Sequence, residues 1–343
     1  MLRRFETYGF AAHATPETQA ELARVLRRTG TYIPEVLDSA VGRNRSATAV
    51  DLVWEHAYEH PDAYARYMCH PFHICILDRH LLPENPECIT ASRRELQLGL
   101  LGYEVAGAPF RWEHGVRRVV AMKTAPGADA AAVASLLAEL NARVGAVPEV
   151  RVSVAAENTM GLEWFPDGWT HVWEQAFDDE AAMLRVAEHD AALLGASPMG
   201  EWLDVWYEIE REPTGAAAVS DARAFARTGS TLLHLVETVV VAPEDTEAYL
   251  EAFERLYLPG ARQRGMNLLS CTHTPRGIGE DVRVMVVFAI GGWADWEQAR
   301  NTAVVDPAMP EWLAARRALV KEGSRHFHEP APFSPGPPPS PRA

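Results

Sequence analysis

A segment of this chain occurs twice, and this repeat constrains the fold more than any other feature. The stretch from Val53 to His73, VWEHAYEHPDAYARYMCHPFH, returns 119 residues later as VWEQAFDDEAAMLRVAEHDAA, from Val172 to Ala192. Seven of the 21 aligned positions are identical: Val53/Val172, Trp54/Trp173, Glu55/Glu174, Ala57/Ala176, Ala63/Ala182, Arg66/Arg185 and His70/His189. Such self-similarity indicates that the chain is built from copies of one supersecondary unit.

The copies predict the same order of elements. Copy two is the clearest, with strands expected over 117–124, 151–157, 170–177 and 201–210 and helices over 129–140 and 180–194. In copy one, Thr15 and Pro16 predict a helix start, because Thr can cap a helix and Pro fits its first position. A third copy is expected after residue 230, with strands over 230–241 and 283–292 and helices over 243–257 and 295–304. Strand, helix, strand, strand, helix and a last strand make the ferredoxin-like plan.

The sequence therefore predicts an α+β protein of three tandem ferredoxin-like domains. The expected boundaries are 1–108, 109–215 and 216–330, followed by a disordered, proline-rich tail over 331–343. A ferredoxin-like sheet has helices on one face only, so its other face needs a cover. Copies one and two can cover each other within the chain as an α+β barrel. Copy three has no partner there, so a homodimer through the third domain is expected.

Charge and composition exclude several classes of partner. The net charge of -15 argues against nucleic-acid and anionic-membrane surfaces, which need a basic face. No apolar run approaches the roughly 20 residues of a spanning helix. The first residues, MLRRFETYGF, lack the apolar core of a signal peptide, and the four cysteines lack CxxC spacing. A cytoplasmic protein that acts on a small molecule is expected.

Differences between the first two copies mark candidate functional residues. Copy one has His56, Tyr67 and His73, and the matching positions of copy two hold Gln175, Val186 and Ala192. Trp54 and His56 share one face of the expected strand, because successive side chains alternate. If this face lines the barrel interior, both side chains line the same pocket as Tyr67 and His73.

Segments in all three copies resemble known families. Residues 67–78, YMCHPFHICILD, resemble the signature of the stress-responsive, dimeric α/β-barrel (Dabb) domains, in which an HPxH element follows a Tyr. FDDEAAMLRVAEHDAALLG in copy two is similar to a degenerate form of that segment. In copy three, DWEQARNTAVVDPAMPEW and SRHFHEPAPFSP resemble NIPSNAP-like domains of the same superfamily. The resemblances cover most of the chain and imply dimeric α/β-barrel folds. The resemblances constrain the reaction less than they constrain the fold, since one fold hosts many activities.

The resemblance to polyketide-cyclase members of the Dabb family implies a catalytic pair. Those enzymes close an aromatic ring by aldol chemistry with a Tyr and a His, which match Tyr67 and His73. The imidazole would be the general base toward a C–H next to a carbonyl, and the phenol would hold the enolate oxygen. We expect a cofactor-independent cyclase or lyase of secondary metabolism, without a metal, in which His56 and Trp54 bind the substrate.

Other interpretations remain open. Tyr67 can be a core residue while His73 bonds a backbone carbonyl, and then neither is catalytic. His70 and His73 are spaced to share a metal ion, but a catalytic site needs a third ligand. The chain can also be a haem- or oxygen-using barrel enzyme of the dehydratase or monooxygenase type, with one His as axial ligand. A non-catalytic, ligand-binding stress protein is the further alternative.

Overall fold

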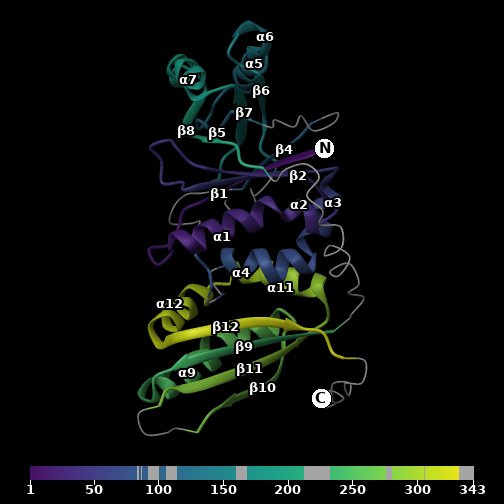
Figure 1. Ribbon diagram of the computed structural model, residues 1–343, viewed down its shortest axis with the longest axis vertical. Coiled ribbons are helices and arrows are strands. Elements are labelled where there is room, and N and C mark those ends of the chain that lie inside the picture. Colours follow the sequence, from purple (N-terminus) through teal and green to yellow (C-terminus); the bar gives the residue numbers. More distant parts are fainter. Residues whose placement is uncertain are drawn as a thin grey trace. The chain divides into compact units, whose positions relative to one another are not determined.

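The chain forms two compact units (Figure 1). The structure is a computed structural model that describes residues 1–82, 85, 87–91, 100–105, 114–159, 168–211, 232–275, 280–304 and 306–331. Unit 1 consists of Met1–Tyr67 and Ile89–Phe225, and unit 2 of Met68–Cys88 and Ala226–Ala343. The predicted tail lies outside the described residues from position 332 onward.

The first sheet of unit 1 comes from copy one. Its elements are β1 (Leu2–Tyr8), α1 (Pro16–Arg27), α2 (Thr29–Tyr32), β2 (Val36–Arg43), β3 (Leu52–Tyr58), α3 (Pro61–Met68) and β4 (Leu100–Glu104). Helix α1 begins at the predicted cap, where the Thr15 side chain accepts a hydrogen bond from the backbone N–H of Thr18. The strand order is β2-β3-β1-β4 and all neighbours are antiparallel. This is the ferredoxin-like topology.

The second sheet of unit 1 repeats that arrangement. Its elements are β5 (Val116–Thr124), α5 (Ala130–Asn141), α6 (Arg143–Ala146), β6 (Val152–Glu157), β7 (His171–Phe177), α7 (Glu180–Gly195) and β8 (Met199–Glu208). The order β6-β7-β5-β8 matches the first sheet. The register matches too, because Arg4 pairs with His56 and Arg118 pairs with Gln175. The positions of β1 and β3 therefore have defined counterparts in β5 and β7.

Unit 2 contains the third sheet. Its elements are β9 (Leu233–Val241), η2 (Pro243–Asp245), α9 (Thr246–Ala252), η3 (Phe253–Tyr257), α10 (Leu258–Gln263), β10 (Asn267–His273), β11 (Val282–Ile290), α11 (Trp293–Val304), α12 (Met309–Leu319) and β12 (Val320–His328). The order β10-β11-β9-β12 is again ferredoxin-like. The predicted α+β class with three such domains is confirmed, and β12 supplies a last strand that the sequence did not make clear.

The segment 68–88 belongs to unit 2, although the predicted first domain, 1–108, includes it. Helix α3 ends at Met68, ahead of Pro71, which disfavours helical backbone in the residue before it. The chain then forms the π-helical turn η1 (His73–Leu77) and α4 (Asp78–Leu81). Ile74 belongs to the hydrophobic core under the third sheet, and α4 lies beside α11 (Figure 1). The range 1–108 thus includes a segment that packs in unit 2.

The two sheets of unit 1 pack face to face. Their shared core combines side chains of both copies, among them Phe5, Val53, Leu101, Val119, Val172 and Val205. At one edge, β2 comes so close to β8 that a side chain at Gly42 would overlap the ring of Tyr207. Glycine is therefore required there for the close approach of the two sheets.

A buried ionic network crosses the same interface. Arg3 Nη2 donates to Glu174 Oε1 at 2.7 Å, and Arg117 Nε donates to Glu55 Oε2 at 3.2 Å. All four of these side chains are fully buried. Each glutamate also accepts a tyrosine hydroxyl, at 2.6 Å from Tyr103 to Glu174 and at 2.9 Å from Tyr207 to Glu55. The arginine and tyrosine of each copy thus bind the glutamate of the other copy.

The third sheet leaves one face partly exposed. Along β9, fully buried residues alternate with half-buried ones, and the half-buried set includes Val236 and Val240. On the neighbouring strand, Met285 belongs to the same face and is 41% exposed. The buried set packs into the core of unit 2. The half-buried set, which mixes valines with His234 and Thr238, forms the face for which a partner was predicted.

Candidate functional site

Three of the four predicted site residues lie together on the first sheet. Trp54 and His56 stack with ring centroids 3.9 Å apart, and the centroid of Tyr67 lies 6.0 Å from that of His56. Trp54, His56 and Tyr67 are all fully buried. The sequence left open which face of β3 these residues occupy. Val53 packs in the inter-sheet core, so the alternating Trp54 and His56 lie on the opposite face, the one covered by α3, and not in the barrel interior.

Glu6 is the acidic centre of this cluster. Arg4 Nη2 lies 2.7 Å from Glu6 Oε1, and the Tyr8 hydroxyl donates to Glu6 Oε2 at 2.5 Å. His56 Nε2 lies 3.7 Å from Glu6 Oε1, and His56 Nδ1 lies 2.7 Å from the Tyr58 hydroxyl. Period-two alternation places Arg4, Glu6 and Tyr8 on the same face of β1. A carboxylate, an imidazole and several phenols are therefore gathered beneath α3.

Burial sets the protonation states in the cluster. Burial, and then the charge of Arg4, hold the pKa of His56 well below its usual value of 6.5. Burial, and then Tyr58, hold the pKa of Tyr67 well above 10.0. At neutral pH the imidazole is uncharged and the phenol keeps its proton. The imidazole can therefore take part in hydrogen bonds in its neutral form, and the phenol can donate a hydrogen bond.

The same face of copy two lacks this chemistry. Where copy one has Glu6, Tyr8, His56, Tyr58 and Tyr67, copy two has Val120, Met122, Gln175, Phe177 and Val186. Arg118, the counterpart of Arg4, is held by Asp190 and Asp204 and donates to Gln175 Oε1 at 2.8 Å. The scaffold therefore forms in copy two without these ionisable and phenolic side chains.

Trp54 has a packing role that both copies share. Its Nε1 donates to Ser39 Oγ at 2.9 Å, and Trp173 Nε1 donates to Ser153 Oγ at the same 2.9 Å in copy two. An identical bond in the copy without the polar cluster is explained by the fold alone. The substrate-binding role predicted for Trp54 gains no support from this geometry.

His73, the predicted general base, belongs to unit 2, whereas Tyr67 belongs to unit 1. His73 Nδ1 lies 3.1 Å from the backbone oxygen of Met68, and its Nε2 lies 3.7 Å from Asp78 Oδ1. These are the contacts that the packing interpretation expects: a buried Tyr67 and a His73 bonded to a carbonyl. Catalysis by the pair stays a prediction.

Glu6, Tyr8 and Tyr58 were missed in the sequence. A usable signal was present, because RRFETY places Arg4, Glu6 and Tyr8 at alternate positions of one strand. Tyr58 lies within the aligned repeat opposite Phe177 and could have been found there, whereas Glu6 and Tyr8 lie on β1, which shares too few identities with β5 to be aligned without the structure.

Two further searches returned nothing within the described ranges. No group of three or more His, Cys, Asp or Glu side chains is arranged there to hold a metal ion. Among the helices that the structure describes, none has the length and apolar character needed to cross a membrane.

No protein-family model and no curated protein matches this chain. Solved structures match parts of it. An anthrone oxidase-like protein is 17% identical over 61% of this chain and 90% of its own, with a TM-score of 0.40. A NIPSNAP-like domain protein from Burkholderia xenovorans is 18% identical over 32% of this chain and 94% of its own, with a TM-score of 0.28. A putative antibiotic biosynthesis monooxygenase from Nitrosomonas europaea is 12% identical over 31% and 96%, with a TM-score of 0.24. At these identities and TM-scores, none carries an argument about activity.

Proposed function

We propose that this chain is a cofactor-independent acid–base enzyme that acts on a carbonyl-containing small molecule, with its site under α3 on the first sheet. One observation carries the proposal: the cluster around Glu6, His56 and Tyr67 is present in copy one and absent from copy two on the same scaffold. Burying ionisable groups costs stability. Since copy two folds without them, copy one does not need them for its fold, and such groups concentrate at functional sites.

The arrangement suits removal of a proton from a carbon next to a carbonyl. A neutral imidazole takes the proton, and the Tyr67 hydroxyl donates a hydrogen bond to the enolate oxygen. The enolate carbon then adds to a second carbonyl carbon of the same substrate, and the resulting alkoxide takes a proton back. Ring closure of a polyketide-like chain is the reaction of this type that the Dabb resemblance implies.

Two histidines are candidates for the base. His56 lies beside Tyr67 and is kept neutral by its surroundings. His73 is the base that the resemblance implies. It belongs to unit 2, whereas Tyr67 belongs to unit 1.

Hydrogen–deuterium exchange provides a direct test that needs no knowledge of the natural substrate. Exchange at the carbon next to the carbonyl is followed by proton NMR in D2O, with an aryl methyl ketone and an aryl β-keto ester as probes. The wild-type protein should accelerate exchange above the buffer rate. Removing the base should lower the acceleration by about 10²–10⁴-fold, and Tyr67→Phe should lower it by less.

The repeat supplies matched variants. His56→Gln installs the residue of copy two, where Gln175 accepts from Arg118, and Arg4 is available at the matching position. His73→Ala likewise installs the counterpart Ala192, and His189→Ala in copy two is the control, with an expected rate equal to wild type. If the exchange rate falls in only one of His56→Gln and His73→Ala, the residue replaced in that variant is the base. No acceleration by wild type, or equal rates in all variants, contradicts the proposed function.

A second candidate is a non-catalytic binding protein, which the full burial of His56 and Tyr67 favours. It predicts no exchange with any probe. Cluster variants would then change only the melting temperature or the affinity for a ligand.

A further inference from the structure

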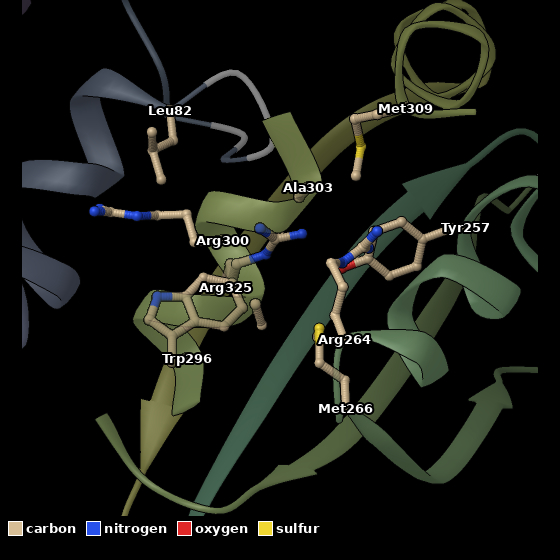
Figure 2. A pocket seen from close by; sticks show the side chains of 10 residues that line it. Leu82, Tyr257, Arg264, Met266, Trp296, Arg300, Ala303, Met309 and Arg325 are labelled. Carbon is tan, nitrogen blue, oxygen red and sulfur yellow. The ribbon is translucent and has the colours of Figure 1, made fainter. Parts of the chain in front are cut away.

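The helix side of the third sheet has no room for a partner. The hollow there, shown in Figure 2, holds about one water molecule at most. Trp296 lines this hollow, and Leu235 and Val239 of β9 pack in the hydrophobic core of unit 2 on the same side of the sheet. A second sheet therefore has room only on the partly exposed face, where Val236 and Met285 lie.

A β-bulge aligns the third sheet with the first. In the first sheet, the register shift in β2 lies opposite Tyr58 and Ala57 of β3. In the third sheet, the shift in β10 lies opposite Phe288 and Val287 of β11. Bulges are conserved features of a fold, so Ala57 corresponds to Val287. The far ends of the strands give the same alignment, because the first residue of β3 pairs with the last of β1, and the first residue of β11 pairs with the last of β9.

The alignment identifies the third-sheet counterparts of the buried ionic network in unit 1. Counted from the bulge, the corresponding residues are Arg3/Val236, Glu55/Met285 and Tyr103/His326. The two positions that carry opposite buried charges in unit 1 are therefore apolar in unit 2. Packing the third sheet against either sheet of unit 1 would leave buried charges without their counter-ions, which is costly. A third sheet from a second copy brings no such charge to these positions.

We propose that the third sheet pairs with the same sheet of a second copy in the register of unit 1, so that Val236 contacts the partner's Met285. In unit 1, the arginine of each copy reaches the glutamate of the other copy at these two positions. A two-fold symmetric interface makes each contact twice. The dimer thus has two apolar contacts where unit 1 has two ion pairs. This pairing rests on the homodimer expected from the sequence, and it is independent of the acid–base function proposed for unit 1.

Introducing the ion pair of unit 1 into the third sheet tests this register. Val236→Arg and Met285→Glu should each weaken self-association at least about 100-fold, because a charge is buried without a counter-ion. Mixed together, the two variants should form a heterodimer, since the new guanidinium of one chain meets the new carboxylate of the other. This heterodimer should be at least about tenfold tighter than either variant's homodimer.

Two measurements follow the association. Native mass spectrometry distinguishes the heterodimer from both homodimers by mass, and sedimentation velocity gives the dissociation constants. Met285 is 41% exposed and Val236 is half-buried in the single chain, so both variants should keep the circular dichroism spectrum of the wild type.

Val240→Arg is the matched control. It places the same charge on the same face of β9, roughly 13 Å along the strand from position 236. Its mixture with Met285→Glu should stay monomeric. A monomeric wild type would overturn the homodimer and this proposal with it. Full-strength dimers of the single variants, no heterodimer in the first mixture, or a heterodimer in the control mixture would overturn the register. None of these results changes the outcome of the hydrogen–deuterium exchange test, so failure of this proposal and failure of the proposed function are separate results.

Discussion

Arg3 of the first copy binds Glu174 of the second, with 2.7 Å between Nη2 and Oε1, and both side chains are fully buried. Arg117 and Glu55 form the reciprocal contact across the interface. Two charges without solvent are stable only when each is paired and hydrogen-bonded. The reciprocal pairing therefore fixes how the two sheets align, because a shift of either sheet would separate both cross-sheet pairs at once.

Glu174→Gln should destabilise unit 1 strongly. The amide leaves the buried charges of Arg3 and Arg117 without their shared counter-ion, and breaking one partner of a buried pair typically costs about 3–5 kcal/mol. Urea denaturation followed by circular dichroism measures the change. Asp178→Asn, in an exposed pair with Arg151, is the control and should not shift the midpoint. A midpoint equal to wild type in Glu174→Gln would show that the network does not hold the sheets together.

Stability should fall in acid through Glu55. Burial alone would raise the pKa of this carboxyl, but Arg117, Arg3 and Arg211 outweigh burial and lower its pKa to about 2. The unfolded chain binds the proton near pH 4.5, so the stabilisation is complete above that pH and is lost as the pH falls toward 2. Urea midpoints measured from pH 7 to 2.5 should show this decline. Glu55→Gln should be less stable at pH 7 and should lose less on acidification; a parallel decline in both proteins would contradict the assignment.

His56 should give a second pH dependence, at higher pH. Its folded pKa lies well below 6.5 because of burial, and the unfolded imidazole takes up a proton near pH 6.5. Stability from the neutral imidazole is complete above that pH and decreases as the pH falls below it. His56→Gln should flatten the melting temperature between about pH 6.5 and 5. His189→Gln, at an exposed site in copy two, should retain the wild-type slope.

We propose that the chain forms a homodimer through the partly exposed face of the third sheet. Within unit 1, the same type of face is covered by a second ferredoxin-like sheet. Val236→Glu should convert the dimer to a monomer, because a charge would be buried in the interface. Sedimentation velocity measures the change, and Leu184→Glu on the exposed side of α7 is the control. A dimer that survives Val236→Glu, or a monomeric wild type, would rule out this interface.

Truncation before the third domain is a weaker test of the same interface. Ile74 packs into the core under the third sheet, so a chain cut near Pro213 would expose it. Loss of solubility after truncation would then reflect a missing core partner, not a missing dimer contact.

The candidate site illustrates how far the repeat alone could lead. Substitutions within the aligned segment, at His56 and Tyr67, pointed to residues that do lie together. Glu6 and Tyr8 remained hidden, because β1 and β5 share little identity and only the strand register aligns them. Strand β12 was also not predicted from the sequence, because its charged residues give no apolar alternation. Its pairing with β9 makes it a strand.

The sequence by itself indicated the fold class and the number of sheets, because these follow from local periodicity and from a repeated segment. Within the third sheet, β10 and β12 emerged only in the structure. It also showed that one copy carries polar groups that the other lacks. Only the tertiary structure decided that the polar side of β3 lies under α3, since alternation defines two faces without saying which is covered. It likewise placed His73 and Ile74 in unit 2, because the core in which a short helical segment packs depends on long-range contacts that no local pattern encodes.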